Sequence, residues 1–219
     1  IFLKKIKLMQ FNYSRTAYSF FKIISIINRG NYIISGNPQL ITNYQPNGIE
    51  NYALTPSQSR AIFHNNDWQK IVGFHTRNVP HMGHEYIQIN ALKMLNADAI
   101  YIAPVIGQKK QGDFRSKIII QSYEKLIKKR IYGNYGVMLS GLNTFSRYSG
   151  PREAVFTAIC HKNFGCSHFI VGRDHTGVRS YYEDSASKII FDNIDLGIVI
   201  ISFNEIFFDR RKNSYLEYS

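Results

Sequence analysis

Short apolar segments alternate with helical patterns along most of the chain, and this alternation restricts the fold more than any other feature of the sequence. The segments predicted as strands are 71–74, 99–106, 135–142, 168–171 and 196–201. Helical patterns lie between successive strands, so each strand is expected to connect to the next through a crossover helix and to run parallel to it. We therefore predict an α/β fold with a doubly wound parallel sheet. Ligands of such sheets bind beyond the carboxyl ends of the strands.

Capping residues mark the starts of three helices. Thr55, Pro56 and Gln58 have the order of a capping box, with proline in the first helical position. Asp113 is expected to cap the helix that follows the second strand. Pro151 is expected in the first turn of the helix before the fourth strand.

The stretch 71–95 combines an apolar strand, a polar turn and the start of a helix. The residues at its junction are Arg77, Asn78, His81, Gly83 and His84. A helix start of this kind offers backbone N–H groups and a positive dipole end to a phosphate. Two histidines three positions apart share one helix face and can approach the same anion.

Two other interpretations of these histidines remain open. A histidine near a helix start is often a cap or a surface residue without further function. His81 and His84 could also supply two metal ligands, but Glu85 is the one further carboxylate or thiol close to them in sequence.

Three loops that follow strands carry most of the unusual polar residues. Their basic side chains are Arg77, Arg147, Arg152, Arg173, His75, His81, His84 and His175. The planar guanidinium group suits tetrahedral oxyanions, and several of them can hold two anions side by side. Such a set fits the attack of one anion on a nucleotide phosphate, a reaction that needs mainly positioning and charge stabilisation.

Four further charged residues have competing interpretations. Asp174 either orients His175 or a ribose, or forms an ordinary salt bridge. Glu153 fits a helix N-terminal residue better than a catalytic base. Lys109 and Lys110 fit a solvated loop better than a phosphate site.

Composition limits the classes of function. The 219 residues carry a formal net charge of +12, spread along the chain, which favours anionic partners. No nucleic-acid recognition motif accompanies that charge, so no specific nucleic acid is expected. The two cysteines and the absence of a membrane-length apolar run favour a cytoplasmic protein without a membrane segment. The chain begins without Met and without a signal-peptide cleavage pattern, so we expect it to be part of something longer.

Three segments, GFHTRNVPHMGHEYI, YSGPREAVFTAICHKNFGCSHFIVGRDHTG and APVIGQKKQGDF, resemble the catalytic domain of the ATP sulfurylase (sulfate adenylyltransferase) family. The resemblance covers roughly 54–208, in the family's order. NYIISGNPQLI is similar to the end of the PUA-like β domain that precedes it in the family. We therefore expect a remnant of that domain and a linker in 1–48, and a C-terminally truncated nucleotidyltransferase domain in 49–219.

The resemblance implies a Rossmann-like domain of the His-x-Gly-His nucleotidyltransferase type. The family's reaction, a step of sulfate assimilation, joins sulfate to the α-phosphate of ATP and gives adenosine 5'-phosphosulfate and pyrophosphate. ATP and sulfate are then the substrates, and Mg2+ accompanies ATP. A homo-oligomer is left open.

The resemblance also assigns roles by position. Catalysis falls on Thr76, Arg77, Asn78, His81 and His84, the two histidines stabilising charge as pyrophosphate leaves. ATP binding falls on His75, Thr76, Arg77, Asn78, Gly172, Arg173, Asp174 and His175. Sulfate binding falls on His75, Arg77 and Thr176.

The sequence departs from the family at several of these positions. His75 replaces a usual Gln that binds sulfate, and Thr176 replaces a usual Ala. Val79 separates Asn78 from Pro80, and Ser149 replaces another usual Ala. No Ile-Ser-Gly-Thr segment follows the last predicted strand. These departures leave open adenylyl transfer to a different oxyanion, and an inactive nucleotide-binding homologue.

Overall fold

The computed structural model describes residues 35–37, 39, 48–146, 149–172, 186–192 and 194–218. The chain divides into two compact units, Ile1–Asn43 and Tyr44–Ser219. Every described helix and strand belongs to the second unit. The expected PUA-like remnant in 1–48 falls almost wholly outside the described residues and stays a prediction.

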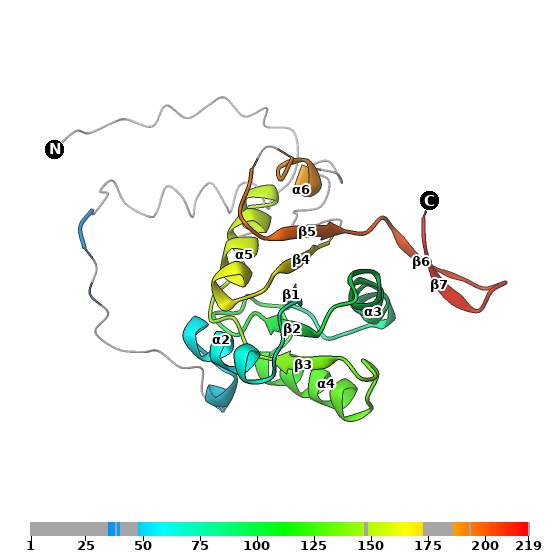
Figure 1. Cartoon of the computed structure of the whole chain (residues 1–219), viewed down its shortest axis with the longest axis horizontal. Coiled ribbons are helices and arrows are strands. Elements are labelled where there is room, and N and C mark those ends of the chain that lie inside the picture. The colour runs from blue at the N-terminus through cyan, green and yellow to red at the C-terminus, as the bar shows by residue number, and fades with distance from the viewer. Residues whose placement is uncertain are drawn as a thin grey trace. The chain divides into compact units, whose positions relative to one another are not determined.

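The second unit alternates helices and strands in the predicted order (Figure 1). The helical elements are η1 (Glu50–Tyr52), α2 (Pro56–Asn65), α3 (Met82–Leu95), α4 (Ser116–Lys128), α5 (Pro151–Phe164) and α6 (Ala186–Ile189). The strands are β1 (Ile71–Thr76), β2 (Ala99–Pro104), β3 (Gly136–Leu139), β4 (His168–Val171), β5 (Val199–Ser202), β6 (Ile206–Asp209) and β7 (Ser214–Glu217).

Strands β1 to β5 form one parallel sheet in the order β3-β2-β1-β4-β5. The chain therefore builds outward from β1 in one direction through β2 and β3, and then returns to the other side of β1 with β4. The prediction of an α/β fold with a parallel sheet is confirmed. The reversal of strand order lies between β1 and β4, where open α/β sheets bind their ligands.

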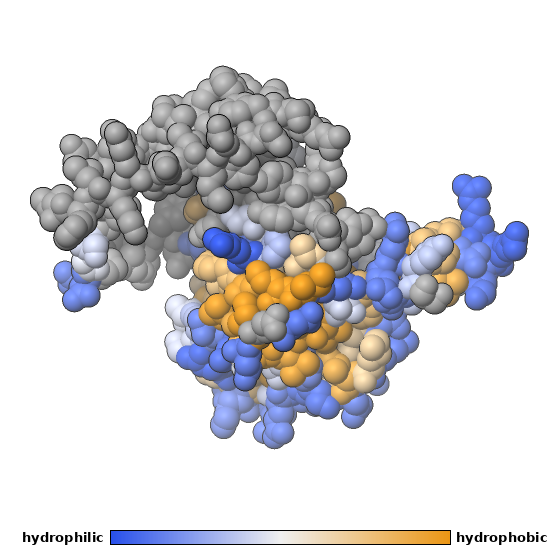
Figure 2. All heavy atoms as spheres, turned by 90° about the horizontal axis from the view of Figure 1, so that it is seen from above, coloured by the Kyte–Doolittle hydropathy of each residue, from blue (hydrophilic) through white to orange (hydrophobic). Residues whose placement is uncertain are grey.

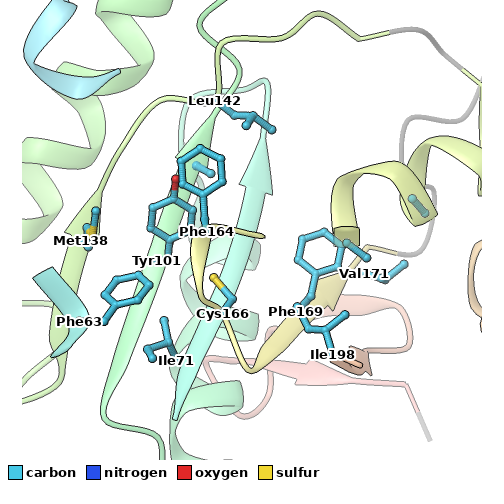
Figure 3. Close-up of a cluster of buried hydrophobic side chains, with 13 residues drawn as sticks. Phe63, Ile71, Tyr101, Met138, Leu142, Phe164, Cys166, Phe169, Val171 and Ile198 are labelled. Atoms are coloured by element: carbon cyan, nitrogen blue, oxygen red, sulfur yellow. The ribbon is translucent and has the colours of Figure 1, made fainter. Parts of the chain in front are cut away.

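One face of the sheet packs against α2 and α5 (Figures 1 and 3). Its largest side chains include Phe63 of α2, Tyr101 of β2 and Phe169 of β4. Small residues of α5, Ala154 and Ala158, are fully buried and let that helix lie close to the strands. Burial of these apolar side chains stabilises the packing of α2 and α5 on the sheet.

The other face packs against α3 and α4. Its buried residues include Val72 and Phe74 of β1, Leu92 of α3 and Ile119 of α4. Consecutive β1 residues thus alternate between the two layers, because side chains along a strand point to opposite faces. Both faces are covered, as expected for a doubly wound parallel sheet.

Two of the three predicted helix starts are correct. Thr55 forms a complete capping box with Gln58, whose backbone N–H donates to the threonine hydroxyl. Pro151 is the first residue of α5. Asp113 does not cap α4, because the helix begins later, at Ser116, and its cap residue Arg115 makes no side-chain cap hydrogen bond. The Asp113 carboxylate instead accepts a hydrogen bond from the backbone N–H of Lys110.

Two elements were not expected from the sequence. The short helix η1 follows the segment 1–48 in which the remnant and linker are expected, and the buried side chain of Ile49 beside it packs on Ile106 and Ile120. Strands β6 and β7 form an antiparallel hairpin after the sheet, beside α3 (Figure 1).

The surface is uneven in polarity. On the face seen in Figure 2, hydrophobic residues gather in one area, and hydrophilic residues lie below it. No helix within the described ranges is both long enough and apolar enough to cross a membrane.

Candidate active site

The turn after β1 is fixed by Thr76. The hydroxyl of Thr76 accepts a hydrogen bond from the backbone N–H of Asn78 at 3.1 Å. The carbonyl oxygen of Thr76 accepts a hydrogen bond from the backbone N–H of Val105 at 2.8 Å. Thr76 is buried, so its side chain shapes the turn from within.

His81 and His84 meet at the start of α3. His81 is the cap residue, and its Nδ1 accepts a hydrogen bond from the backbone N–H of His84 at 3.4 Å. The two rings are stacked, with centroids 3.7 Å apart and planes inclined by 25°. The expectation that both side chains converge at this helix start agrees with this arrangement.

Gly83 allows this stacking. A Cβ at position 83 would lie 3.2 Å from Nδ1 and Cε1 of His81. The absence of a side chain at Gly83 thus leaves room for the imidazole ring of His81.

Burial controls the charge of His84. Its ring contacts Phe74 edge to face at a centroid distance of 5.4 Å, and its Nδ1 is buried without a hydrogen-bond partner among the described residues. Burial, and to a smaller extent the positive charge of His81, lowers the pKa of His84 to about 4. His84 is therefore neutral at pH 7.

A pocket of about 200 Å³ opens beside the two histidines. It is lined by His81, Gly83 and His84, by Gly172 at the end of β4, and by 203–206 after β5. The pocket thus lies where strand order reverses between β1 and β4. Gly172 is far from His81 and His84 in the sequence, and all three line this pocket. Arg147, Arg173, Asp174, His175 and Thr176 lie outside the described residues.

A second pocket, of about 210 Å³, lies at the ends of the neighbouring strands. Arg77 lines it after β1, Lys109 and Asp113 after β2, and Phe145 and Ser146 after β3. Lys109 was expected in a solvated loop. The residue is half-buried, and its Nζ atom is shielded from solvent.

His75 occupies a different position. It is half-buried at the end of β1, and its ring lies 6.0 Å from that of the buried His161 in α5. Neither of the two pockets is lined by His75.

Glu153 and Arg152, the two candidates at the start of α5, differ in exposure to solvent. Glu153 is buried, and its Oε2 accepts a hydrogen bond from the backbone N–H of Ser149 at 3.0 Å. This geometry confirms Glu153 as a helix N-terminal residue. Arg152 is exposed.

The described part of the chain contains no cluster of three or more His, Cys, Asp or Glu side chains suited to hold a metal ion. Cys160 and Cys166 are not joined in a disulfide.

Comparisons with known proteins point to one family. The sequence model of the ATP-sulfurylase family matches residues 50–218. A protein of Ignicoccus hospitalis named sulfate adenylyltransferase is 43% identical over 187 residues, which are 85% of this chain and 48% of that protein. Proteins of the same name from Thermococcus onnurineus and Aeropyrum pernix are 41% and 45% identical over 190 and 184 residues. These matches cover 86% and 84% of this chain, and 49% and 47% of those proteins.

The chain thus spans about half the length of the curated relatives it matches. Among solved structures, the one titled "Hexameric APS kinase from Thiobacillus denitrificans" matches with a TM-score of 0.59 and 19% identity. That match covers 80% of this chain and 32% of the other. At this identity the likeness concerns the fold alone.

Proposed function

The chain belongs to the ATP-sulfurylase family, and from this premise we propose that its 49–219 domain is an adenylyltransferase. It joins sulfate to the α-phosphate of ATP and releases pyrophosphate, giving adenosine 5'-phosphosulfate. We further propose that the domain is of the His-x-Gly-His type and that 1–48 is a PUA-like remnant.

The observation that carries the proposal is the stacked pair His81 and His84 at the start of α3. The pair borders a pocket that Gly172 also lines, at the reversal point of the sheet. Parallel sheets place phosphates at such a helix start, because the first backbone N–H groups and the positive dipole end point toward it. We assign the triphosphate of ATP to this pocket.

In the reaction, a sulfate oxygen attacks the α-phosphorus in line, and the bond from that phosphorus to the bridging oxygen of pyrophosphate breaks. Negative charge then builds on the departing pyrophosphate. His81 accepts a hydrogen bond at Nδ1, so the N–H that its ring can donate lies at Nε2. The lowered pKa of His84 keeps that ring neutral at pH 7, with one N–H to donate. Fixed donors of this kind stabilise charge as it develops.

The proposal also includes the metal ion that accompanies ATP, the remaining binding residues and the place of the reaction. ATP enters as its Mg2+ complex, with the ion bound to phosphate oxygens and counted as part of the substrate. Arg77, Asn78 and the 172–176 loop complete the nucleotide and sulfate contacts in this proposal. We propose the cytoplasm as the place of reaction, which suits two cysteines that are not joined in a disulfide.

The direct test is pyrophosphate release from the chain with ATP and Mg2+, with and without sulfate. Sulfate-dependent release, together with formation of adenosine 5'-phosphosulfate, is the expected result. ATP binding without release under any condition, also in a chain extended to the length of the relatives, would contradict the proposal and favour an inactive nucleotide-binding homologue.

A second candidate function is adenylyl transfer to another oxyanion acceptor. His75 and Thr176 favour it, because they replace residues that contact sulfate in the family. Pyrophosphate release that ignores sulfate and responds to a phosphorylated or carboxylated acceptor would select this candidate.

A further inference from the structure

Lys109 is an unusual lysine, because its ammonium group is buried without a partner. Nζ is shielded from solvent, and no described residue accepts a hydrogen bond from it. A buried charge without acceptors is costly, and proteins seldom keep one unless it binds something. The group therefore indicates a missing anionic partner.

The charges around Lys109 point the same way. The ammonium group lies in the pocket that Arg77 also lines. Burial, and in addition the positive charge of Arg77, lowers the pKa of Lys109, while the Asp113 carboxylate acts in the opposite direction. Three cationic residues, Arg77, Lys109 and Lys110, thus line one cavity, and Asp113 is the one carboxylate among its described lining residues.

The Asp113 carboxylate is engaged elsewhere. It accepts a hydrogen bond from the backbone N–H of Lys110 at 3.0 Å, and the backbone N–H of Asp113 donates to the carbonyl of Lys110 at 3.1 Å. These two bonds close the loop after β2 into a tight turn. Asp113 therefore shapes the loop, and within the described part of the chain no residue accepts a hydrogen bond from the Lys109 ammonium.

The opposite wall of the cavity is also fixed. A Cβ at Gly107 would lie 2.2 Å from the carbonyl oxygen of Thr144, so the loops after β2 and β3 touch through their backbones. Phe145 and Ser146, just beyond that contact, line the pocket. The site is preorganised, and such sites bind small charged groups with little loss of conformational entropy.

The charge of the cavity, rather than its size, indicates the ligand. Its volume of about 210 Å³ can hold a small ion with its water, and the pocket beside His81 and His84 has a similar volume of about 200 Å³. The cationic side chains that line the cavity suit a tetrahedral dianion. The nucleotide pocket lies on the other side of the turn after β1, beside His81 and His84.

We propose that Lys109, together with Arg77, binds the acceptor oxyanion, sulfate, in this second pocket. The inference rests on the proposed function and extends it by naming Lys109 as a binding residue for the acceptor. A phosphate group of the nucleotide has the same chemistry, so the test has to separate the two.

The test compares Lys109→Met with Lys128→Met, which removes the same charge from the exposed end of α4. Initial rates are measured against sulfate and against ATP at constant ionic strength. Loss of one charge-assisted contact is expected to raise KM for sulfate at least about tenfold in Lys109→Met and to leave KM for ATP within about twofold. Lys128→Met is expected to match the native chain, and Lys109→Arg to recover part of the loss.

An unchanged KM for sulfate would overturn the inference while leaving the proposed function intact. A raised KM for ATP with an unchanged KM for sulfate would also overturn it, and would assign a nucleotide phosphate to the pocket. If the native chain does not turn over, calorimetric titration with sodium sulfate decides the question. Weaker binding in Lys109→Met supports the site, whereas equal binding in both, or no binding by the native chain, overturns it.

The variant is expected to fold. Methionine keeps the length of the side chain and removes an unpaired buried charge. The urea midpoint of Lys109→Met should therefore equal or exceed that of the native chain, so a change in KM reports on binding.

Discussion

His81 and His84 stack on each other, yet they differ in exposure, and this difference separates their roles. His81 is exposed and caps α3 through its Nδ1. His84 is half-buried against Phe74, which keeps it neutral at pH 7. A neutral imidazole can donate one hydrogen bond to a phosphate oxygen through its N–H.

Replacement of His84 tests whether its N–H stabilises the charge that develops on pyrophosphate. His84→Ala is expected to lower kcat of sulfate-dependent pyrophosphate release on the order of 100-fold, because one fixed donor to the developing charge is lost. The matched control is His64→Ala, which removes an exposed histidine at the end of α2. A kcat within twofold of the native value, in a variant with an unchanged near-ultraviolet CD spectrum, would exclude His84 from the chemistry.

The sequence was sufficient to predict that His81 and His84 lie close together, but not that the ammonium group of Lys109 is buried. The histidines lie three positions apart on one predicted helix, so their proximity follows from local geometry. Burial of Lys109 depends on the segment after β3, about 35 residues further along the chain. No local pattern carries that information, although the glycine at position 107 marks a close backbone approach.

At the scale of elements, the position of the site depends on how α5 packs on β1. The ring of His161 in α5 is fully buried, and Gly73 in β1 provides the space for it. A Cβ at position 73 would lie 2.5 Å from Cδ2 of His161. The rings of Tyr101 and Phe169 on either side limit any movement of the imidazole.

Gly73→Ala is therefore expected to destabilise the domain by about 1–3 kcal/mol through overpacking. Equilibrium urea unfolding, monitored by fluorescence of the single Trp68, measures the change. Gly36→Ala is the control, because a Cβ there meets nothing within 4 Å. Equal urea midpoints for Gly73→Ala and the native chain would show that α5 can shift without loss of stability, and would contradict the prediction.

The elements that were predicted correctly are those with a strong local period. β2 is buried along its whole length, and α4 carries a clear apolar stripe, so both were found from the sequence. The hairpin of β6 and β7 was missed, because its residues are mostly half-buried or exposed and its alternation is weak. It packs beside α3, a tertiary contact that the segment itself does not encode.

For the whole molecule, two pockets flank the carboxyl end of β1, one bordered by histidines and one by Arg77 and Lys109. Arg77, in the turn after β1, lines the second pocket, and His81, which follows that turn, lines the first. In the proposed function, nucleotide and acceptor therefore meet near the end of β1. The parallel sheet could be predicted from the order of apolar segments. The second pocket could not, since it forms where three loops distant in sequence touch.

Two buried histidines make the stability of the whole domain depend on pH. Burial lowers the pKa of His84 and of His161 from 6.5 to about 4 in each case. Between these values the unfolded chain binds protons that the folded chain does not, so the free energy of unfolding falls as pH decreases from about 6.5 toward 4. The loss by pH 5 is expected to be on the order of 2 kcal/mol for each group. Urea unfolding at pH 7.5, 6 and 5 measures it.

His161→Asn isolates one of the two contributions. The amide N–H can replace the Nδ1 hydrogen bond to the carbonyl of Thr157, and it does not titrate. The variant loses packing and absolute stability, yet its unfolding free energy should change less between pH 7.5 and 5 than that of the native chain. Carboxylates with lowered pKa, such as Asp98, act mainly below this range. If both proteins show the same pH dependence, the His161 ring becomes protonated without unfolding of the domain, and the prediction is contradicted. The complete burial of the ring beside Tyr101 and Phe169 opposes protonation in the folded state.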